Sequence, residues 1–174
     1  MLVIKTQFFS GSALKYHQKI YDLDPLLNIL APLQANGKKI VFTNGCFDIL
    51  HIGHTRYLQE ARFAGDYLVV AVNSDKSVKA LKTNKRPIVK LAERMEVLSG
   101  FSFVDFVVSF DDLDPYKVIS QIQPDVLIKG GDWPVEKIIG KDIVEAKGGN
   151  VYNIPEIKGN STSNIISTII NRYQ

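Results

Sequence analysis

Short apolar runs alternate with amphipathic stretches along the chain after residue 38. The apolar runs are rich in Val, Ile or Phe and are bounded by Gly, Asp, Asn or Pro, which is typical of buried parallel strands. The predicted strands are Lys39–Thr43, Tyr67–Val72, Asp105–Ser109, Asp125–Lys129 and Asn150–Ile154.

The amphipathic stretches predict helices before, between and after these strands. Gly65 and Gly148 stand where C-terminal helix caps are expected, and Ser161 stands at the N-cap of the last helix. The predicted helices are 24–36, Gly53–Ala64, Leu91–Gly100, Pro115–Gln121, Lys141–Lys147 and Thr162–Tyr173.

This alternation predicts an α/β fold with a doubly wound, Rossmann-like parallel five-stranded sheet and helices on both faces. We expect residues 24–174 to form this domain and residues 1–23 to form an N-terminal extension. In such sheets ligands bind beyond the carboxyl ends of the strands, where the strand order reverses. Loops with unusual chemistry follow the first and fourth predicted strands, so both would face one cleft if these strands are neighbours.

Composition limits the classes of partner. The chain is 45% hydrophobic and 22% charged, as is ordinary for a globular protein, and its net charge of +3 gives no sign of nucleic-acid binding. Cys46 is the single cysteine, which excludes an internal disulfide and indicates a reducing, cytoplasmic compartment. The first residues do not resemble a signal peptide, and no apolar stretch approaches the roughly 20 residues of a membrane helix. We therefore expect neither a membrane nor a nucleic-acid partner.

His51 and His54 flank Gly53 at the start of the helix predicted after the first strand. Residues three apart share one face of a helix, and a helix N-terminus offers unpaired N–H groups to an anion. We interpret the pair as part of a triphosphate site. Capping or surface histidines are the plainer alternative, and zinc is disfavoured because no third His or Cys ligand is suitably placed.

The segment Asn44–Asp48 precedes the histidines and is a candidate for nucleotide contacts. Gly45 permits close backbone approach to a base or ribose. Phe47 can stack on a base or pack in the core, and core packing is favoured. Cys46 fits a small packing residue better than a nucleophile, because no base is evident nearby. Asp48 can fix the loop by hydrogen bonds.

A second candidate loop, Lys129-Gly130-Gly131-Asp132-Trp133, ends the fourth strand. Its consecutive glycines suggest close backbone approach to a ligand, and Lys129 can meet a phosphate. A plain glycine-rich turn with a solvated lysine is the alternative. Trp133 can form a wall of the nucleotide pocket or merely pack.

Basic residues follow the second strand at Lys79, Lys82, Lys85 and Arg86. Such a run is usually a solvated loop, but beside a phosphate site it can act as a mobile lid that neutralises charge. Arg94, on the next helix, can reach the same phosphates or form a surface ion pair. Ser161 and Thr162 open the last helix, where they can hold a phosphate or simply cap the helix.

Taken together, these segments resemble the HIGH-motif nucleotidyltransferase superfamily. Within it the chain is similar to the D-glycero-β-D-manno-heptose 1-phosphate adenylyltransferases, the ADP-heptose synthases, in a standalone form without a kinase domain. The Thr-Asn-Gly-Cys-Phe-Asp and Lys-Gly-Gly-Asp segments narrow the resemblance from the superfamily to this family. The histidine pair alone does not, because many transferases share it. The matching segments are Val41–His51, Tyr57–Arg62, Val72–Asp75, Arg86–Pro87, Pro124–Asp132 and Gly159–Thr162.

The resemblance implies that His51, His54 and Lys82 are catalytic residues acting on the ATP phosphates. It places Asp48, Lys79 and Trp133 on the substrate side, and no metal site made by the protein is expected. The segment 88–94 differs from the proline- and acid-bearing stretch that is usual in the family at this place. The difference affects the expected identity of the sugar substrate more than the expected type of reaction. The implied nucleotide-binding residues are Asn44, Gly45, Cys46, Phe47, Arg86, Lys129, Gly131, Asp132, Ser161 and Thr162.

The implied reaction transfers AMP from ATP to a sugar 1-phosphate for the synthesis of a lipopolysaccharide or other glycan precursor. Its implied partners are ATP with Mg²⁺, the sugar phosphate and a second copy of the chain in a homodimer. Two interpretations stay open beside it. One is a cytidylyltransferase acting on glycerol 3-phosphate or a similar alcohol phosphate, and the other is a catalytically silent nucleotide-binding protein.

Overall fold

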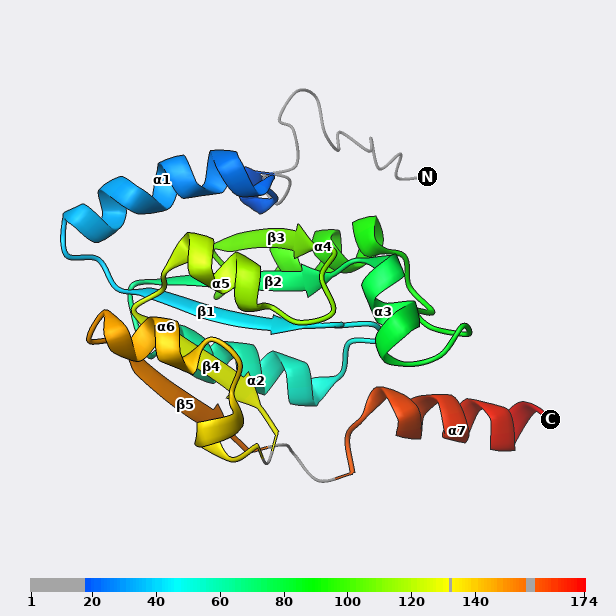
Figure 1. Ribbon diagram of the computed structural model, residues 1–174. Coiled ribbons are helices and arrows are strands. Elements are labelled where there is room, and N and C mark those ends of the chain that lie inside the picture. The colour runs from blue at the N-terminus through cyan, green and yellow to red at the C-terminus, as the bar shows by residue number, and fades with distance from the viewer. Residues whose placement is uncertain (1–17, 132, 156–158) are drawn as a thin grey trace, which may run out of the picture.

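The computed structural model describes residues 18–131, 133–155 and 159–174. Its centre is a five-stranded parallel sheet with the strand order β3-β2-β1-β4-β5 (Figure 1). The first and fourth strands are neighbours, as the cleft hypothesis requires, and the strand order reverses between them. The strands are β1 (Ile40–Gly45), β2 (Tyr67–Asn73), β3 (Phe106–Phe110), β4 (Val126–Gly130) and β5 (Asn150–Ile154).

The α-helices agree with the predicted ones to within a few residues, except that α3 was not predicted. Its lysines suggested a solvated loop, but Ser74 caps the helix by accepting a hydrogen bond from the Ser77 amide at 3.2 Å, and Ser77 and Val78 are buried. The helices are α1 (Leu23–Ala35), α2 (Ile52–Arg62), α3 (Asp75–Leu81), α4 (Leu91–Ser99), α5 (Tyr116–Ile122), the 3₁₀ turn η2 (Val135–Lys137), α6 (Lys141–Ala146) and α7 (Thr162–Tyr173).

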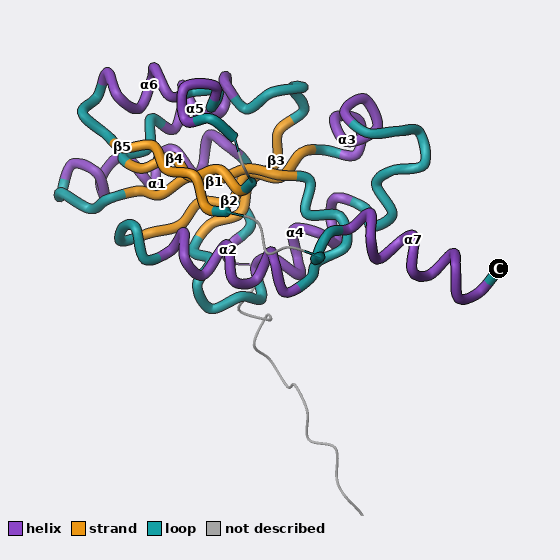
Figure 2. Tube along the Cα trace, turned by 90° about the horizontal axis from the view of Figure 1, so that it is seen from below, coloured by secondary structure: helices purple, strands orange, loops and turns teal. Residues whose placement is uncertain are grey.

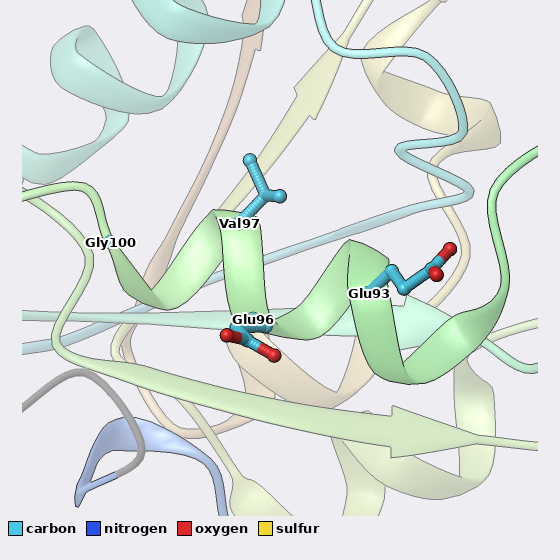
Figure 3. Close-up of a pocket in the computed structure, with 4 residues that line it drawn as sticks. All are labelled: Glu93, Glu96, Val97 and Gly100. Carbon is cyan, nitrogen blue, oxygen red and sulfur yellow. The ribbon is translucent and has the colours of Figure 1, made fainter. Parts of the chain in front are cut away.

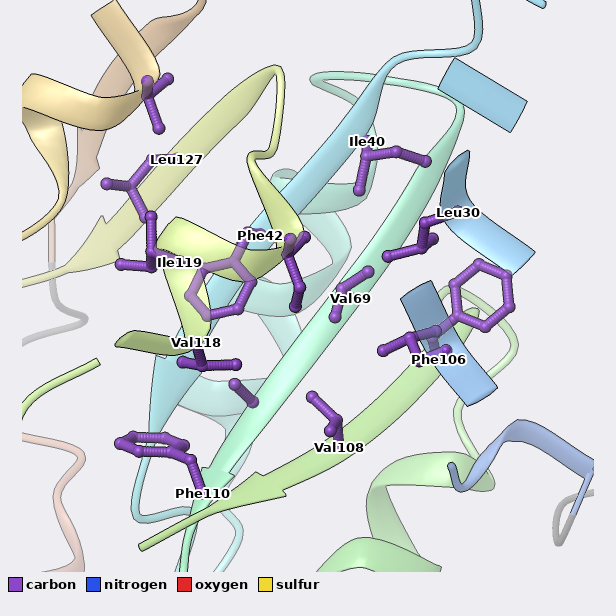
Figure 4. Packing of buried hydrophobic residues seen from close by; sticks show 14 of the residues in the cluster. Leu30, Ile40, Phe42, Val69, Phe106, Val108, Phe110, Val118, Ile119 and Leu127 are labelled. Atoms are coloured by element: carbon purple, nitrogen blue, oxygen red, sulfur yellow. The ribbon is translucent and has the colours of Figure 1, made fainter. Parts of the chain in front are cut away.

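Helices cover both faces of the sheet, as predicted (Figure 2). The side chains of β1 alternate: Ile40 and Phe42 join the cluster under α1, α5 and α6, whereas Val41 joins the cluster under α2 and α4. Figure 4 shows the first of these clusters, in which Phe42 lies among side chains of neighbouring strands and helices. This packing gives the carboxyl ends of the strands a rigid base.

Two glycines expected as helix caps differ in role. Gly148 follows α6 with a φ of +79° and is a C-terminal cap as predicted. Gly65 is not the cap, because α2 ends at Arg62 and Phe63 is its C-cap residue. Instead Gly65 permits close packing on the sheet, since a Cβ there would lie 2.7 Å from the Val41 Cγ2.

Part of the predicted N-terminal extension packs against the sheet. Ile20 forms a parallel bridge with Val107, and the Tyr21 amide donates to the Val107 carbonyl at 3.0 Å. The Tyr21 ring meets Phe106 edge-on at 5.8 Å. Residues 1–17 lie outside the described residues, so the proposed boundary of the extension stays a prediction. In the described part of the chain, no helix has the length and apolarity to cross a bilayer.

Candidate active site

The candidate site lies where β1 and β4 end, at the point where the strand order reverses. The Lys129 ammonium on β4 donates a hydrogen bond to the Asn44 Oδ1 on β1 at 3.3 Å. Burial lowers the pKa of Lys129, the Cys46 thiol opposes that shift, and the charge of Lys82 adds to it. Lys82, the C-cap residue of α3, is therefore near enough to Lys129 for their charges to interact, although α4, β3 and α5 lie between them in the sequence.

The two histidines lie together at the N-terminus of α2, as their spacing predicts. His51 is the N-cap, and its Nδ1 accepts a hydrogen bond from the Gly53 amide at 3.2 Å. The rings of His51 and His54 have centroids 4.0 Å apart at an angle of 36°. A Cβ at Gly53 would lie 2.9 Å from the His51 ring, so the glycine leaves room for that ring.

The protonation of this pair follows from its surroundings. Because the His51 Nδ1 accepts a hydrogen bond, the proton of the neutral ring is on Nε2. Burial lowers the pKa of His54 to about 4, with a smaller contribution from His51. The His54 Nδ1 is buried without a hydrogen-bond partner among the described residues. An anion bound here would favour the charged rings and raise the pKa of His54.

Asp48 fastens the loop that carries Arg86. Its side chain is 0% exposed and pairs with the Arg86 Nε, while its oxygens accept from the amides of Ile88 and Val89 at 2.8 Å. Burial raises the pKa of Asp48, but these hydrogen bonds outweigh burial and hold it below its usual value. Because the carboxylate is fully enclosed, this geometry supports the loop-fixing role considered from the sequence. The assignment of Asp48 to the substrate side stays a prediction, and nothing in these contacts favours it.

Arg94 is a buried cross-link and neither a phosphate ligand nor a surface ion pair. Its side chain is 0% exposed. The guanidinium donates to the Cys46 carbonyl, to the Val89 carbonyl at 3.0 Å and to the Asp75 Oδ1 at 2.8 Å. One side chain thus joins the loop after β1, the start of α3 and the loop before α4.

Phe47 belongs to the core, the alternative favoured from the sequence. It is 4% exposed and adopts a left-handed backbone with φ +47°, and its ring centroid is 5.5 Å from that of His54. Its ring therefore supports His54 and offers no face on which a base could stack. Burial raises the pKa of the Cys46 thiol, against the opposing charges of Lys82, Arg94 and Arg86, which fits a packing role.

The last helix reaches back to the histidine loop. The Thr162 hydroxyl donates to the Ile49 carbonyl at 3.2 Å, two residues before His51. The Ser161 hydroxyl accepts from the Asn164 amide at 3.1 Å and caps α7, as predicted. The first turn of α7 is therefore placed beside the N-terminus of α2.

The remaining predicted residues are less closely tied to the histidines. Lys79 and Trp133 are exposed. Gly131 has a φ of +105°, which favours glycine, and its amide donates to the Ile154 carbonyl at 3.0 Å. Asp132 lies outside the described residues.

Sequence reasoning assigned no role to Tyr57. Its hydroxyl hydrogen-bonds to the Thr43 side chain and donates to the Ile128 carbonyl at 3.0 Å. The sequence offered one indication of such a role, because Tyr57 follows His54 by three residues and lies on the same face of α2. It could not show the hydrogen-bond partners of Tyr57, which come from two strands far apart in the sequence.

A surface pocket along α4 is separate from this site. Figure 3 shows its lining by Glu93, Glu96, Val97 and Gly100. Two carboxylates beside a valine would repel a phosphate, so we do not place the nucleotide there. Among the described residues, no three His, Cys, Asp or Glu side chains gather as metal ligands.

Comparisons with known proteins indicate the family of the chain. A sequence model of the cytidylyltransferase-like family matches residues 42–172. The bifunctional protein HldE of Citrifermentans bemidjiense is 49% identical over 155 residues, which are 89% of this chain and 32% of that protein. The HldE protein of Ectopseudomonas mendocina is 48% identical over 153 residues, 88% of this chain and 32% of that protein. The chain thus spans about a third of the length of these curated relatives.

Two solved structures have a fold similar to that of this chain. A lipopolysaccharide core biosynthesis protein from Thermoplasma volcanium is 30% identical with a TM-score of 0.57, covering 71% of this chain and 100% of that chain. A pantoate-β-alanine ligase from Francisella tularensis has a TM-score of 0.59 at 16% identity, over 88% of this chain and 76% of that one, and shares the fold alone. The resemblance to nucleotidyltransferases drawn from the sequence is confirmed. Since the family match runs from β1 through the histidine pair to α7, the chain belongs to the cytidylyltransferase-like family.

Proposed function

We propose that the chain is an adenylyltransferase that transfers AMP from ATP to D-glycero-β-D-manno-heptose 1-phosphate, giving an ADP-sugar and pyrophosphate. The observation that carries the proposal is the pair of histidine rings, 4.0 Å apart at the N-terminus of α2, beside the point where the strand order reverses. The identity of nearly half the aligned residues to proteins named HldE supports it. So does the likeness to a protein named for lipopolysaccharide core biosynthesis.

The proposed reaction is an in-line displacement at the α-phosphorus of ATP. An oxygen of the sugar phosphate forms the new P–O bond while the bond from the α-phosphorus to the bridging oxygen breaks, and pyrophosphate leaves. A phosphate monoester is itself a nucleophile near neutral pH, so no protein nucleophile is required. Catalysis then depends on alignment and on stabilising charge on the phosphate oxygens.

The chain's own residues supply that stabilisation in three places. His51 and His54 bring imidazole donors and the positive end of α2 to the phosphates. Lys82 and Lys129 bring ammonium groups from α3 and β4. Burial lowers the pKa of Lys129, and a bound phosphate would restore its preference for the charged form.

Mg²⁺ is part of the proposal as a companion of ATP. Bound to the triphosphate, it would neutralise charge on the leaving pyrophosphate. The enclosed carboxylate of Asp48 is already engaged by Arg86, Ile88 and Val89. The residues at hand therefore fit a metal that arrives with the phosphates, and their task is to hold the phosphates.

The test is a grid of ATP, CTP, GTP and UTP against heptose 1-phosphate, other sugar phosphates and glycerol 3-phosphate, read by pyrophosphate release. Release with ATP and the heptose phosphate alone is the expected result. Release with CTP and glycerol 3-phosphate would replace the proposal with the cytidylyltransferase. ATP binding without release in any combination would indicate a silent nucleotide-binding protein.

The proposal includes a cytoplasmic location and a homodimer. The single cysteine, Cys46, and the use of ATP fit a reducing compartment. The exposed Ile169 and Ile170 on α7 give the second copy an apolar surface to cover. Light scattering coupled to size exclusion tests the dimer, and a monomeric mass at micromolar concentration would contradict it.

A further inference from the structure

We propose that Tyr57 is a positioning residue that fixes the distance between the two loops of the site, by bridging β1 and β4 where their pairing stops. Its catalytic consequence rests on the proposed adenylyl transfer. The bridge itself is a feature of the fold and can be tested without turnover.

The need for a bridge follows from the register of the sheet. β1 pairs with β2 along its whole length, from Ile40 to Gly45. Within the described sheet, β1 pairs with β4 only at Val41–Val126 and Phe42–Leu127. Beyond Phe42 and Leu127 the two strands continue without ladder pairs between them. The site loops grow from this unpaired region, so their separation is not set by backbone hydrogen bonds.

The Tyr57 hydroxyl lies just past the last ladder pair. It donates to the carbonyl of Ile128, which follows Leu127, at 3.0 Å. Its oxygen also hydrogen-bonds to the side chain of Thr43, which follows Phe42. With its own proton given to Ile128, the tyrosine oxygen accepts the proton of Thr43. One hydroxyl thereby links the two strands at the first position where the ladder fails.

The environment keeps this hydroxyl protonated and in place. Burial raises the pKa of Tyr57 well above its usual value, so the O–H donor persists in alkaline solution as well as at neutral pH. Thr43 is 0% exposed, and water is therefore kept from its side of the bridge.

The ring of Tyr57 supports the second loop of the site. A Cβ at Gly130 would lie 3.2 Å from the Tyr57 Cε2 and 3.4 Å from its Cζ, so the backbone of the loop rests on the ring. Gly130 directly follows Lys129. Tyr57 is also three residues after His54 on α2, so it places His54 and Lys129 relative to each other through a single side chain.

Losing the bridge should harm catalysis more than folding. In-line transfer depends on alignment, and a displacement of about 1 Å can cost roughly 100-fold in rate. Tyr57→Phe removes only the hydroxyl and leaves the ring under Gly130. We expect this variant to fold, to lose about 10- to 100-fold in kcat and to keep its ATP KM within a few-fold, because the Tyr57 hydroxyl is already engaged by Thr43 and the Ile128 carbonyl.

The matched control is Tyr116→Phe, the same chemical change at a hydroxyl that contacts the exposed Asp142 at 2.9 Å on the far side of the sheet. Thr43→Val supplies a double-mutant cycle. Since Thr43 and Tyr57 act as one bridge, the double variant should lose no more kcat than Tyr57→Phe alone. An unchanged kcat in Tyr57→Phe, or fully additive losses in the cycle, would overturn the proposal.

A readout that needs no turnover separates this inference from the proposed function. Amide hydrogen exchange by NMR should speed up in Tyr57→Phe at Gly130, Gly131 and Gly45, with no change at Ile40 or Val41. If the wild type releases no pyrophosphate with any pair of nucleotide and phosphate substrate, the proposed reaction is wrong. The Tyr57 bridge can still be tested in that case, because amide hydrogen exchange does not depend on turnover. Unchanged exchange at Gly130 and Gly131 would overturn the bridge whatever the activity.

Discussion

At the scale of single residues, the site depends on two imidazoles held close together and partly removed from water. The ring of His51 is fixed by the Gly53 amide, and the ring of His54 rests against Phe47. Neither ring needs a metal to be held in place. Their fixed orientation is what an electrostatic role requires, because donors must be aimed before charge develops.

The first prediction concerns His54. In His54→Ala the phosphates lose one preorganised donor, which typically costs on the order of 10²–10³ in rate. We expect kcat to fall by at least 100-fold while the far-UV circular dichroism is unchanged. His17→Ala makes the same chemical change outside the motif and should retain wild-type kcat. Near-normal turnover in His54→Ala would remove the pair from the mechanism.

The depressed pKa of His54 also predicts how stability depends on pH. The unfolded ring binds a proton below about pH 6.5, whereas the folded ring resists protonation down to about pH 4. The unfolded state therefore binds more protons between these values, and this contribution to stability is lost as pH falls through that window. These two pKa values correspond to a loss of about 2 kcal/mol in the free energy of unfolding between pH 7 and pH 5. Because the ring is partly exposed, this figure is an upper bound.

Urea unfolding of the wild type and of His54→Gln at pH 7 and pH 5 measures this effect. The free energy of unfolding should fall less in His54→Gln than in the wild type over this interval. Equal losses in the two proteins would show that His54 is not held neutral by its surroundings.

At the scale of elements, loops that lack secondary structure are held by buried charged side chains. Asp48 fastens the loop carrying Arg86, and Arg94 ties the loop after β1 to α3. α7 is joined to the histidine loop through Thr162. The site is thus assembled by cross-links between elements, each made by one side chain.

Asp48→Asn tests the first of these cross-links. The amide keeps the shape of the carboxylate but loses its charge and turns an N–H group toward other donors. Hydrogen bonds to charged groups are worth about 1.5–3 kcal/mol, so we expect a loss of roughly 2 kcal/mol in stability. With Arg86 released, the ATP KM should rise about 10-fold.

Asp66→Asn is the matched control, since Asp66 accepts from the Lys39 amide at 2.8 Å at the opposite end of the sheet. It should leave the ATP KM unchanged. If Asp48→Asn binds ATP as the wild type does, the loop is positioned by something other than this carboxylate.

At the scale of the whole molecule, the site draws on segments spread over most of the chain, from Asn44 to Thr162. A ligand that contacts several of them binds the folded state alone and must raise its stability. At about 100 times its Kd, Mg²⁺–ATP should add about 2.7 kcal/mol, or roughly 5–10 °C in Tm for a chain of this size.

Differential scanning fluorimetry with ATP, CTP and AMP checks this prediction. ATP should give the largest rise in Tm, and His51→Ala/His54→Ala should abolish most of it. An equal rise in that double variant would place the nucleotide elsewhere, and a larger rise with CTP would favour the cytidylyltransferase.

The sequence by itself determined the strands, most of the helices and the family, because these depend on local periodicity and on motifs contiguous in the chain. It also determined that His51 and His54 lie side by side, because residues three positions apart at a helix N-terminus share one face of the helix. It missed α3, where surface lysines hid a short helix whose buried face is only Ser77 and Val78.

Only the tertiary structure decided what Asp48, Arg94 and Tyr57 do. Each has partners that are distant in the sequence: Ile88 for Asp48, Cys46 for Arg94 and Ile128 for Tyr57. A polar side chain has the same local pattern whether it meets a ligand or a distant backbone group. The choice is made by burial, because a buried charge or hydroxyl must find a partner inside the fold, and only the packed sheet shows which partner is within reach.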